Sequence, residues 1–419
     1  MTQIKDALRE FNPWWEGKFK VEFKEREILS KMEKFLKLPQ IIALTGLRRV
    51  GKTTLMLKIG EEFVNKGLEP RRVLYFSFDE FRKTGLREVI QAYEEMMEAN
   101  VRDGKFLLLL DEVQKLDGWE DQIKGIYDLY GKGMKIIISG SESLFIKRKT
   151  NETLAGRIFS FKVGLLTFRE FLIFRGARLE PVGLYERELN RLLEDYIITL
   201  GLPELVHVRD KEIIKKYVKE GIIDKVVYRD MQQMFRIKDI SKIDSILNML
   251  LEEPGQLWDL SELASELGIS RQTLSTYLTY LEESFLVKKL YNYSKNRRKV
   301  ERKLKKYYPT IISPDLLFRD DSFSKSKVFE WLIVMQLDPD FFWRDTFKNE
   351  VDIVMFDKEK AMPVEVKYGK IEHGGLLAFA KKFSVSEGKI VSRSSEEKRK
   401  VNGMVVNVVP AVKFLLRKT

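Results

Sequence analysis

The 419-residue chain contains no cysteine and only two histidines. Without cysteine it has no disulfide framework and no thiolate metal site, and two histidines argue against an ordinary structural zinc site. The chemistry of this chain must therefore rest on other side chains.

Long apolar runs are also missing. The longest, residues 106–110, is far too short to cross a bilayer. Residues 1–6 lack the apolar core that a signal peptide requires. We therefore expect no membrane association and a cytoplasmic location.

Charge, in contrast, is abundant. Charged residues make up 33% of the chain and its net charge is +12, which favours a polyanionic partner, nucleic acid before membrane. A heavily charged surface that is merely solvated is the alternative. High lysine and glutamate content without cysteine is typical of a thermophilic source. The length predicts two to four domains.

A phosphate-binding loop is predicted at residues 46–54. Apolar residues 41–44 precede a Gly-x4-Gly-Lys-Thr pattern, and apolar residues follow it at helical spacing. Backbone N–H groups of such a loop, with the amino end of the next helix, cradle phosphate oxygens. Lys52 would reach the β- and γ-phosphates, and the Thr53 hydroxyl would hold Mg2+. Arg48 and Arg49 either contact phosphate or face solvent. The predicted nucleotide-binding residues are Gly46, Leu47, Arg48, Arg49, Val50, Gly51, Lys52, Thr53 and Thr54.

Acidic residues are predicted to complete this site. A buried strand at residues 105–110 delivers Asp111 and Glu112 at its carboxyl end, where ligands bind in open α/β sheets. Asp111 would bind Mg2+, directly or through water, and Glu112 would orient the attacking water. The strand at residues 135–138 ends in Ser139, Gly140 and Ser141. In the implied sheet order Ser139 lies beside the γ-phosphate and could sense it.

Together these motifs resemble the archaeal and bacterial AAA+-type ATPases of the STAND-related group. Besides the loop, the resemblance rests on Leu110-Asp111-Glu112, Ser139-Gly140-Ser141, Leu154-Ala155-Gly156-Arg157 and Phe168-Arg169-Glu170-Phe171. Gly201-Leu202-Pro203-Glu204 is similar to the Gly-Gly-x-Pro-Glu turn of their lid, with Leu202 departing from the commoner spacing. The resemblance covers about residues 30–235. It implies ATP as the nucleotide and a helical lid above it.

In that family an arginine after the last strand can complete the site, and the resemblance places this role on Arg157. An arginine finger places its guanidinium group against the negative charge that develops on the γ-phosphoryl group. The arginine comes either from the same chain or from a neighbouring copy in a homo-oligomer. The alternative is that Arg157 only forms a salt bridge to the lid.

Residues 240–294 resemble a winged helix-turn-helix. A short helix and a Leu-Gly-Ile-Ser turn precede a helix whose outer face is polar and begins with Arg271 and Gln272. That face could reach base edges or phosphates in a major groove. The alternative is that this winged helix mediates only protein contacts and does not bind DNA.

Residues 295–306 form the densest basic run, predicted to be a linker. Such residues release counterions from a phosphate backbone and give salt-sensitive binding. A merely solvated linker is the alternative. The predicted contacts here are Lys295, Arg297, Arg298 and Lys299, and four flanking tyrosines could stack on bases or belong to a core: Tyr291, Tyr293, Tyr307 and Tyr308.

The last predicted unit carries an Asp about a dozen residues before a Glu-x-Lys. Asp352 and Glu365 on neighbouring strands would hold a second divalent metal, and Lys367 would help activate water. This segment resembles the PD-(D/E)xK nuclease-like domain that often closes these ATPases, with Glu330 on its first helix as a further match. Val351 replaces the usual proline. The sequence is compatible with a domain that cleaves nucleic acid and with one that is an inactive scaffold. Residues 384–400 are predicted to be a mobile loop.

The predicted fold class is α/β: a P-loop core with a parallel sheet and helical lid, then a winged helix-turn-helix, then a restriction-endonuclease-like α/β domain. The predicted boundaries are 1–166 (core), 167–239 (lid), 240–294 (winged helix), 295–306 (basic linker) and 307–419 (nuclease-like). The leading hypothesis is an ATPase that acts on DNA. The second is a nucleotide-dependent switch with an inactive tail, and the third is a sequence-specific regulator.

Overall fold

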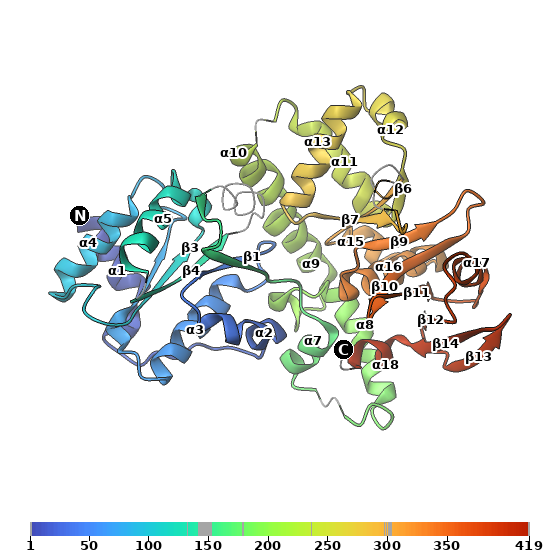
Figure 1. Cartoon of the computed structure of the whole chain (residues 1–419), viewed down its shortest axis with the longest axis horizontal. Coiled ribbons are helices and arrows are strands. Elements are labelled where there is room, and N and C mark those ends of the chain that lie inside the picture. The colour runs from blue at the N-terminus through green and yellow to red at the C-terminus, as the bar shows by residue number, and fades with distance from the viewer. Residues whose placement is uncertain are drawn as a thin grey trace. The chain divides into compact units, whose positions relative to one another are not determined.

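The structure of the chain, a computed structural model, describes residues 2–131, 133–140, 153–177, 180–235, 237–296, 298, 300 and 304–417. The chain divides into two compact units, Met1–Leu166 and Thr167–Thr419 (Figure 1). Among the described residues, no helix has the length and apolarity needed to span a bilayer. Three residues with sequence-based predictions, Ser141, Arg297 and Lys299, lie outside the described residues.

A five-stranded parallel sheet forms the centre of the first unit. Its order is β2-β3-β4-β1-β5, with β1 (Ile41–Thr45), β2 (Val73–Ser77), β3 (Phe106–Asp111), β4 (Met134–Gly140) and β5 (Ile158–Lys162). The first four strands are buried along nearly their whole length, which is why their sequences are almost continuous apolar runs. The helices are α1 (Thr2–Phe11), α2 (Glu27–Leu36), α3 (Lys52–Asn65), α4 (Leu86–Met97) and α5 (Trp119–Tyr130), with 3-10 turns at Pro13–Trp15, Pro70–Arg72 and Val113–Lys115.

This strand order brings the predicted site residues to one edge of the sheet. The parallel strands β1, β4 and β3 are neighbours in that order, so Thr45, Gly140 and Asp111 all lie at the carboxyl edge. The phosphate-binding loop follows β1, Asp111 ends β3 with Glu112 directly after it, and Ser139 is the next-to-last residue of β4. The predicted α/β class is confirmed, including the parallel sheet of the core.

One mixed sheet of nine strands organises the second unit, in the order β13-β14-β12-β11-β10-β9-β7-β8-β6. The strands are β6 (Gln256–Trp258), β7 (Val287–Asn292), β8 (Lys305–Pro309), β9 (Phe341–Arg344), β10 (Glu350–Asp357), β11 (Lys360–Lys367), β12 (Glu387–Ser392), β13 (Glu397–Val401) and β14 (Met404–Pro410).

The helices of the second unit lie in two stretches of the chain, residues 168–234 and residues 240–416. The first comprises α7 (Phe168–Arg175), α8 (Glu186–Thr199), a 3-10 turn at Pro203–Leu205, α9 (Lys211–Val218), π-helical segments at Lys219–Ile223 and Val226–Met231, and α10 (Gln232–Met234). The second comprises α11 (Ile240–Glu252), α12 (Leu260–Glu266), α13 (Arg271–Glu283), α15 (Pro314–Leu317), α16 (Ser322–Leu337), α17 (Gly374–Phe383) and α18 (Ala411–Leu416).

The basic run is not a linker throughout. Its last two residues, Lys305 and Lys306, begin β8, which pairs antiparallel with both β6 and β7. Strand β7 in turn pairs in parallel with β9. The strands of the segment predicted as a winged helix therefore continue into the C-terminal sheet.

The prediction of a mobile loop at residues 384–400 is wrong. This segment contains β12, which pairs with β11 on one side and β14 on the other, and β13, which pairs with β14. Ile390 and Val391 are buried. Two apolar residues among charges are too weak a pattern to predict a strand, whereas pairing on both sides satisfies the backbone of β12.

Candidate functional site

The glycines of the phosphate-binding loop are required by its geometry. Gly46 has φ +146°, and a Cβ built on it would lie 2.2 Å from the backbone oxygen of Val163. Gly51 has φ +92° and caps the amino end of α3. Both values lie where residues with a side chain are strained. Gly46 therefore lets the loop pack closely against Val163, and Gly51 lets the chain turn into α3.

Lys52 is held inside the curve of this loop. Its Nζ donates hydrogen bonds to the carbonyl oxygens of Gly46 and Leu47, each at 2.9 Å, and the residue is buried. Since the first turn of α3 begins at Lys52, its ammonium group and the helix amino end place positive charge in the same region. This is the charge pattern that favours phosphate.

Asp111 is the centre of a hydrogen-bond network that joins three strands and the loop. Thr53 Oγ1 donates to its Oδ2 at 2.6 Å, and the backbone N–H of Glu112 donates to its Oδ1 at 3.1 Å. The Ser139 hydroxyl from β4 also donates to Oδ1. The structure thus brings together Thr53, Asp111 and Ser139, which the sequence predicted as parts of one site.

Glu112 stands beside this network in a strained backbone conformation, with φ +54°. Gln114 Nε2 donates to its Oε2 at 2.6 Å. Burial raises the pKa of Glu112, while the positive charges of Lys52 and Arg48 oppose that rise. Arg48 is half-buried and close enough to Glu112 for its charge to act there, and a contact of Arg48 with phosphate stays a prediction.

Two residues of the site have no motif to reveal them. Tyr75 on β2 donates its hydroxyl to Asp111 Oδ2 at 3.0 Å, and burial together with the Asp111 charge raises its pKa, so it remains a donor. Arg26, only 6% exposed, donates from Nη1 to the Val50 carbonyl and from Nη2 to the Gly164 carbonyl, both at 2.9 Å. Period-2 spacing on β2 could have placed Tyr75; nothing in the local sequence marks Arg26.

The predicted nuclease residues of the second unit also lie together. Asp352 on β10 accepts a hydrogen bond from the Val366 N–H on β11 at 2.8 Å, and Lys367 Nζ lies 3.2 Å from Glu365 Oε2. Burial, the charge of Asp352 and a hydrogen bond to Asp352 raise the pKa of Glu365 to about 9.

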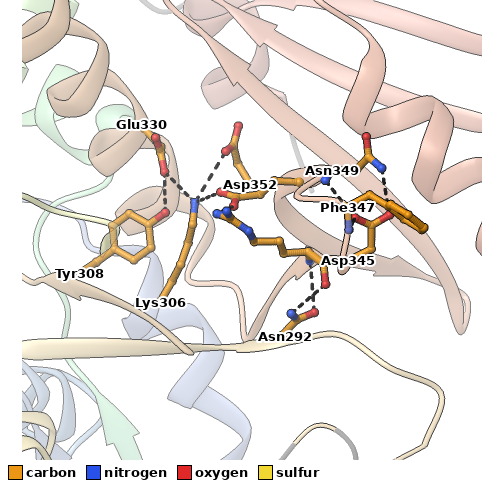
Figure 2. A network of polar contacts seen from close by, with 10 residues as sticks. Asn292, Lys306, Tyr308, Glu330, Asp345, Phe347, Asn349 and Asp352 are labelled. Carbon is orange, nitrogen blue, oxygen red and sulfur yellow. Dashed lines mark hydrogen bonds and ion pairs between the residues drawn. The ribbon is translucent and has the colours of Figure 1, made fainter. Parts of the chain in front are cut away.

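Lys306 lies among three acidic side chains of this unit, although the sequence places it in a basic run. It is 4% exposed, and its Nζ lies 2.5 Å from Glu350 Oε1, 3.3 Å from Glu330 Oε1 and 3.9 Å from Asp352 Oδ1 (Figure 2). Burial disfavours its charged form, but the surrounding negative charges outweigh this and raise its pKa. Among the described residues, no group of three or more acidic or histidine side chains is arranged to hold a metal.

The predicted DNA-contacting residues that the structure describes are exposed. Arg271 and Gln272 begin α13 on its open face, and Lys295 and Arg298 follow β7. The stacking alternative is wrong for Tyr307 and Tyr308, because both are buried. Tyr293 packs against the rings of Phe341, Phe356, Phe379 and Phe383.

Comparison with known proteins gives the first unit a class. Residues 38–172 match the family model described as an AAA domain. The first unit is a P-loop domain of the AAA+ type. Residues 190–310 and 328–414 match models described as domains of unknown function (DUF8612 and DUF4143).

Several known proteins are similar over much of the chain. An uncharacterized protein of Methanocaldococcus jannaschii is 28% identical over 326 residues, covering 72% of this chain and 67% of its own. One of Haemophilus influenzae is 26% identical over 260 residues, covering 60% and 62%. The solved structure of Thermotoga maritima RuvB aligns with a TM-score of 0.33 and 18% identity, over 64% of this chain and 90% of RuvB.

The AAA+ domain offers residues that fit a magnesium–nucleotide complex. The Thr53 hydroxyl and the Asp111 carboxylate meet at one point, and both are oxygen ligands of the kind that Mg2+ prefers. Lys52 Nζ, held by the Gly46 and Leu47 carbonyls, supplies positive charge for the phosphates.

Arg157 does not reach this site within its own chain. It precedes β5, and its carbonyl accepts from the Ile41 N–H at the start of the parallel strand β1, so it lies at the amino edge of the sheet. The loop follows the other end of β1, about 16 Å away at ~3.3 Å per residue. Its Nε pairs with Asp128 on α5 at 3.0 Å, so the predicted partner in the lid is also wrong. A role for Arg157 in a neighbouring copy stays a prediction.

Proposed function

We propose that the AAA+ domain binds ATP with Mg2+ and hydrolyses it. The observation that carries this proposal is the 2.6 Å bond between Thr53 and Asp111, which joins the loop to the acidic pair across the sheet. These two residues would hold Mg2+, which when bound neutralises charge on the β- and γ-phosphates.

The side chains around this bond have distinct roles in the proposal. Lys52 and the loop N–H groups bind the phosphates and stabilise the charge that develops during transfer. Glu112 orients the attacking water or accepts a proton from it, once its carboxylate has left its hydrogen bond with Gln114. Ser139 reports on the γ-phosphate through its bond to Asp111.

A single assay tests the proposal: ATP turnover by the full chain, with and without duplex DNA. We expect Mg2+-dependent hydrolysis that Lys52→Ala abolishes. Lys66→Ala is the matched control, since Lys66 lies at the far end of α3 and is 64% exposed. Protein that neither binds nor hydrolyses ATP at its working temperature would contradict the proposal.

We further propose that the second unit contacts DNA. The order α11, β6, α12, α13, β7, β8, with antiparallel strands β6-β8-β7, supports the predicted winged helix. The exposed amino end of α13 offers Arg271 and Gln272 to base edges or phosphates. Lys295 and Arg298 would follow the phosphate backbone.

Salt dependence tests this contact. We expect Arg298→Ala to weaken binding to all sequences and to lower the slope of log K against log salt by about 1. Lys400→Ala removes an equally exposed charge on β13 and should leave the slope unchanged. DNA binding that is equally tight at low and physiological salt would contradict a phosphate clamp.

For residues 307–419 the proposal is a nuclease-like domain, in one of two forms. In the active form Glu330, Asp352 and Glu365 hold a second divalent metal and Lys367 assists cleavage. In the inactive form the domain is a scaffold, and ATP controls assembly or partner binding. The position of Lys306 favours the inactive form. Metal-dependent cleavage that Asp352→Ala abolishes and Lys52→Ala spares would establish the active form instead.

A further inference from the structure

We infer that the ammonium group of Lys306 takes the place of a divalent metal ion in the C-terminal domain, so that its acidic cluster binds no metal. We call Lys306, Glu330, Glu350 and Asp352 the Lys306 cluster. The inference concerns the second unit alone and does not depend on ATP hydrolysis.

The geometry around Lys306 is that of an internal cation. One carboxylate oxygen from α16 and two from β10 surround its Nζ, at 3.3, 2.5 and 3.9 Å. Figure 2 shows Lys306 reaching between Glu330 and Asp352. A divalent metal needs oxygen ligands at about 2.0–2.6 Å on several sides. The ammonium group already occupies the point where these oxygens converge.

The acids are also engaged by other donors. Tyr308 donates its hydroxyl to the same Glu330 oxygen that faces Lys306, at 2.6 Å, and Arg344 Nη1 lies 2.8 Å from Glu350 Oε2. Asp352 Oδ2 accepts from the Val366 N–H. These donors fix the carboxylates in the orientation that faces Lys306, so a metal would have to displace the lysine to bind there.

The origin of Lys306 adds a structural role. It comes from β8, which is separated from β10 by β7 and β9 in the sheet, and its Nζ lies 5.7 Å from the ring centre of Phe342 on β9. The ammonium group thus lies beside the Phe342 ring of β9 where it meets the acids. Because a buried lysine must be paired, the cluster links the strands of the predicted winged helix to the C-terminal domain.

The experiment measures binding of Mn2+ alone to the full chain without nucleotide, by the EPR signal of free Mn2+. Asp111→Asn serves as the background, so that the nucleotide site lacks the carboxylate proposed to bind Mg2+. We expect no Mn2+ site that depends on Asp352. A stoichiometric site that Asp352→Asn removes would overturn the inference.

A second variant tests whether the lysine is the cause. In the same background, Lys306→Met keeps the length of the side chain and removes its charge, and we expect the folded variant to gain Mn2+ binding that Asp352→Asn removes. Lys306→Arg, which keeps the charge, should gain none. A folded Lys306→Met protein without a Mn2+ site would overturn the inference. If Lys306→Met does not fold, the Mn2+ measurement on the protein that retains Lys306 still tests the inference.

Discussion

Arg26 is expected to set the shape of the phosphate-binding loop, although it lies outside the motif in the sequence. Its guanidinium group joins the Val50 carbonyl inside the loop to the Gly164 carbonyl beyond β5. Arg26→Met keeps much of the buried volume and removes both bonds.

The size of the effect follows from these two bonds. A hydrogen bond from a charged group contributes about 1.5–3 kcal/mol, so their loss costs about 3–6 kcal/mol, divided between unfolding and loosening of the loop. If about 1.4 kcal/mol of this loss weakens ATP binding, the affinity for ATP drops tenfold. We therefore expect the Kd for ATP to rise at least about tenfold, measured by titration with a fluorescent nucleotide.

Two variants give this experiment its controls. Arg26→Lys can reach one carbonyl but not both, so its Kd should lie between those of the wild type and Arg26→Met. Arg9→Met removes an exposed arginine of α1 and should change neither affinity nor folding. A folded Arg26→Met protein whose Kd stays within about threefold of the wild type would refute the reasoning.

Three further predictions concern particular side chains. Gly46→Ala should abolish ATP binding while the circular dichroism spectrum is retained, since its Cβ would collide with the Val163 oxygen. Gly17→Ala, whose Cβ would make only an ordinary contact at 3.6 Å with the Pro13 oxygen, should bind normally. Wild-type affinity in Gly46→Ala would contradict the geometry. Arg157→Ala should lower turnover by about 10³ or more without changing ATP affinity, and mixing it with a P-loop lysine variant should restore activity if the arginine acts on a neighbouring copy. The pKa of Glu365 is raised to about 9 from an ordinary value near 4.5, so its contribution to stability is complete below pH 4.5 and is lost as pH rises toward 9. Denaturant unfolding should show this as a slope of at most about 1.4 kcal/mol per pH unit that Glu365→Gln removes; an unchanged slope would mean that another group titrates.

The nucleotide site was predictable because each part is local and one rule joins the parts. Lys52 and Thr53 belong to a short motif, Asp111 ends an apolar run, and Ser139 ends the next strand. Parallel strands bring their carboxyl ends to one edge, so the sequence predicts that these residues meet. Arg157 fails by the same rule: it precedes its strand, and the parallel sheet places it at the opposite edge.

The burial of Lys306 among acidic side chains could not be predicted by such rules. Along β8 the side chains alternate, so Lys306 and Tyr308 share one face and Lys305 and Tyr307 the other. Both faces thus carry one lysine and one tyrosine, and period-2 analysis finds no difference between them. What distinguishes Lys306 is a set of acids 24 to 46 positions later in the chain, brought beside it by the order of the sheet.

The same acids therefore support two conclusions that differ in chemistry. Asp352 and Glu365 lie on adjacent strands with Lys367 beside them, and the nuclease-like arrangement stays a prediction. Yet a cluster of carboxylates needs positive charge whether or not it catalyses, since burying it uncompensated is costly. A metal ion and a lysine both meet that need, but only the metal can activate water for cleavage. The source of the compensating charge, and not the presence of the acids, thus decides between an active nuclease and a scaffold, and the contacts of Lys306 favour the scaffold.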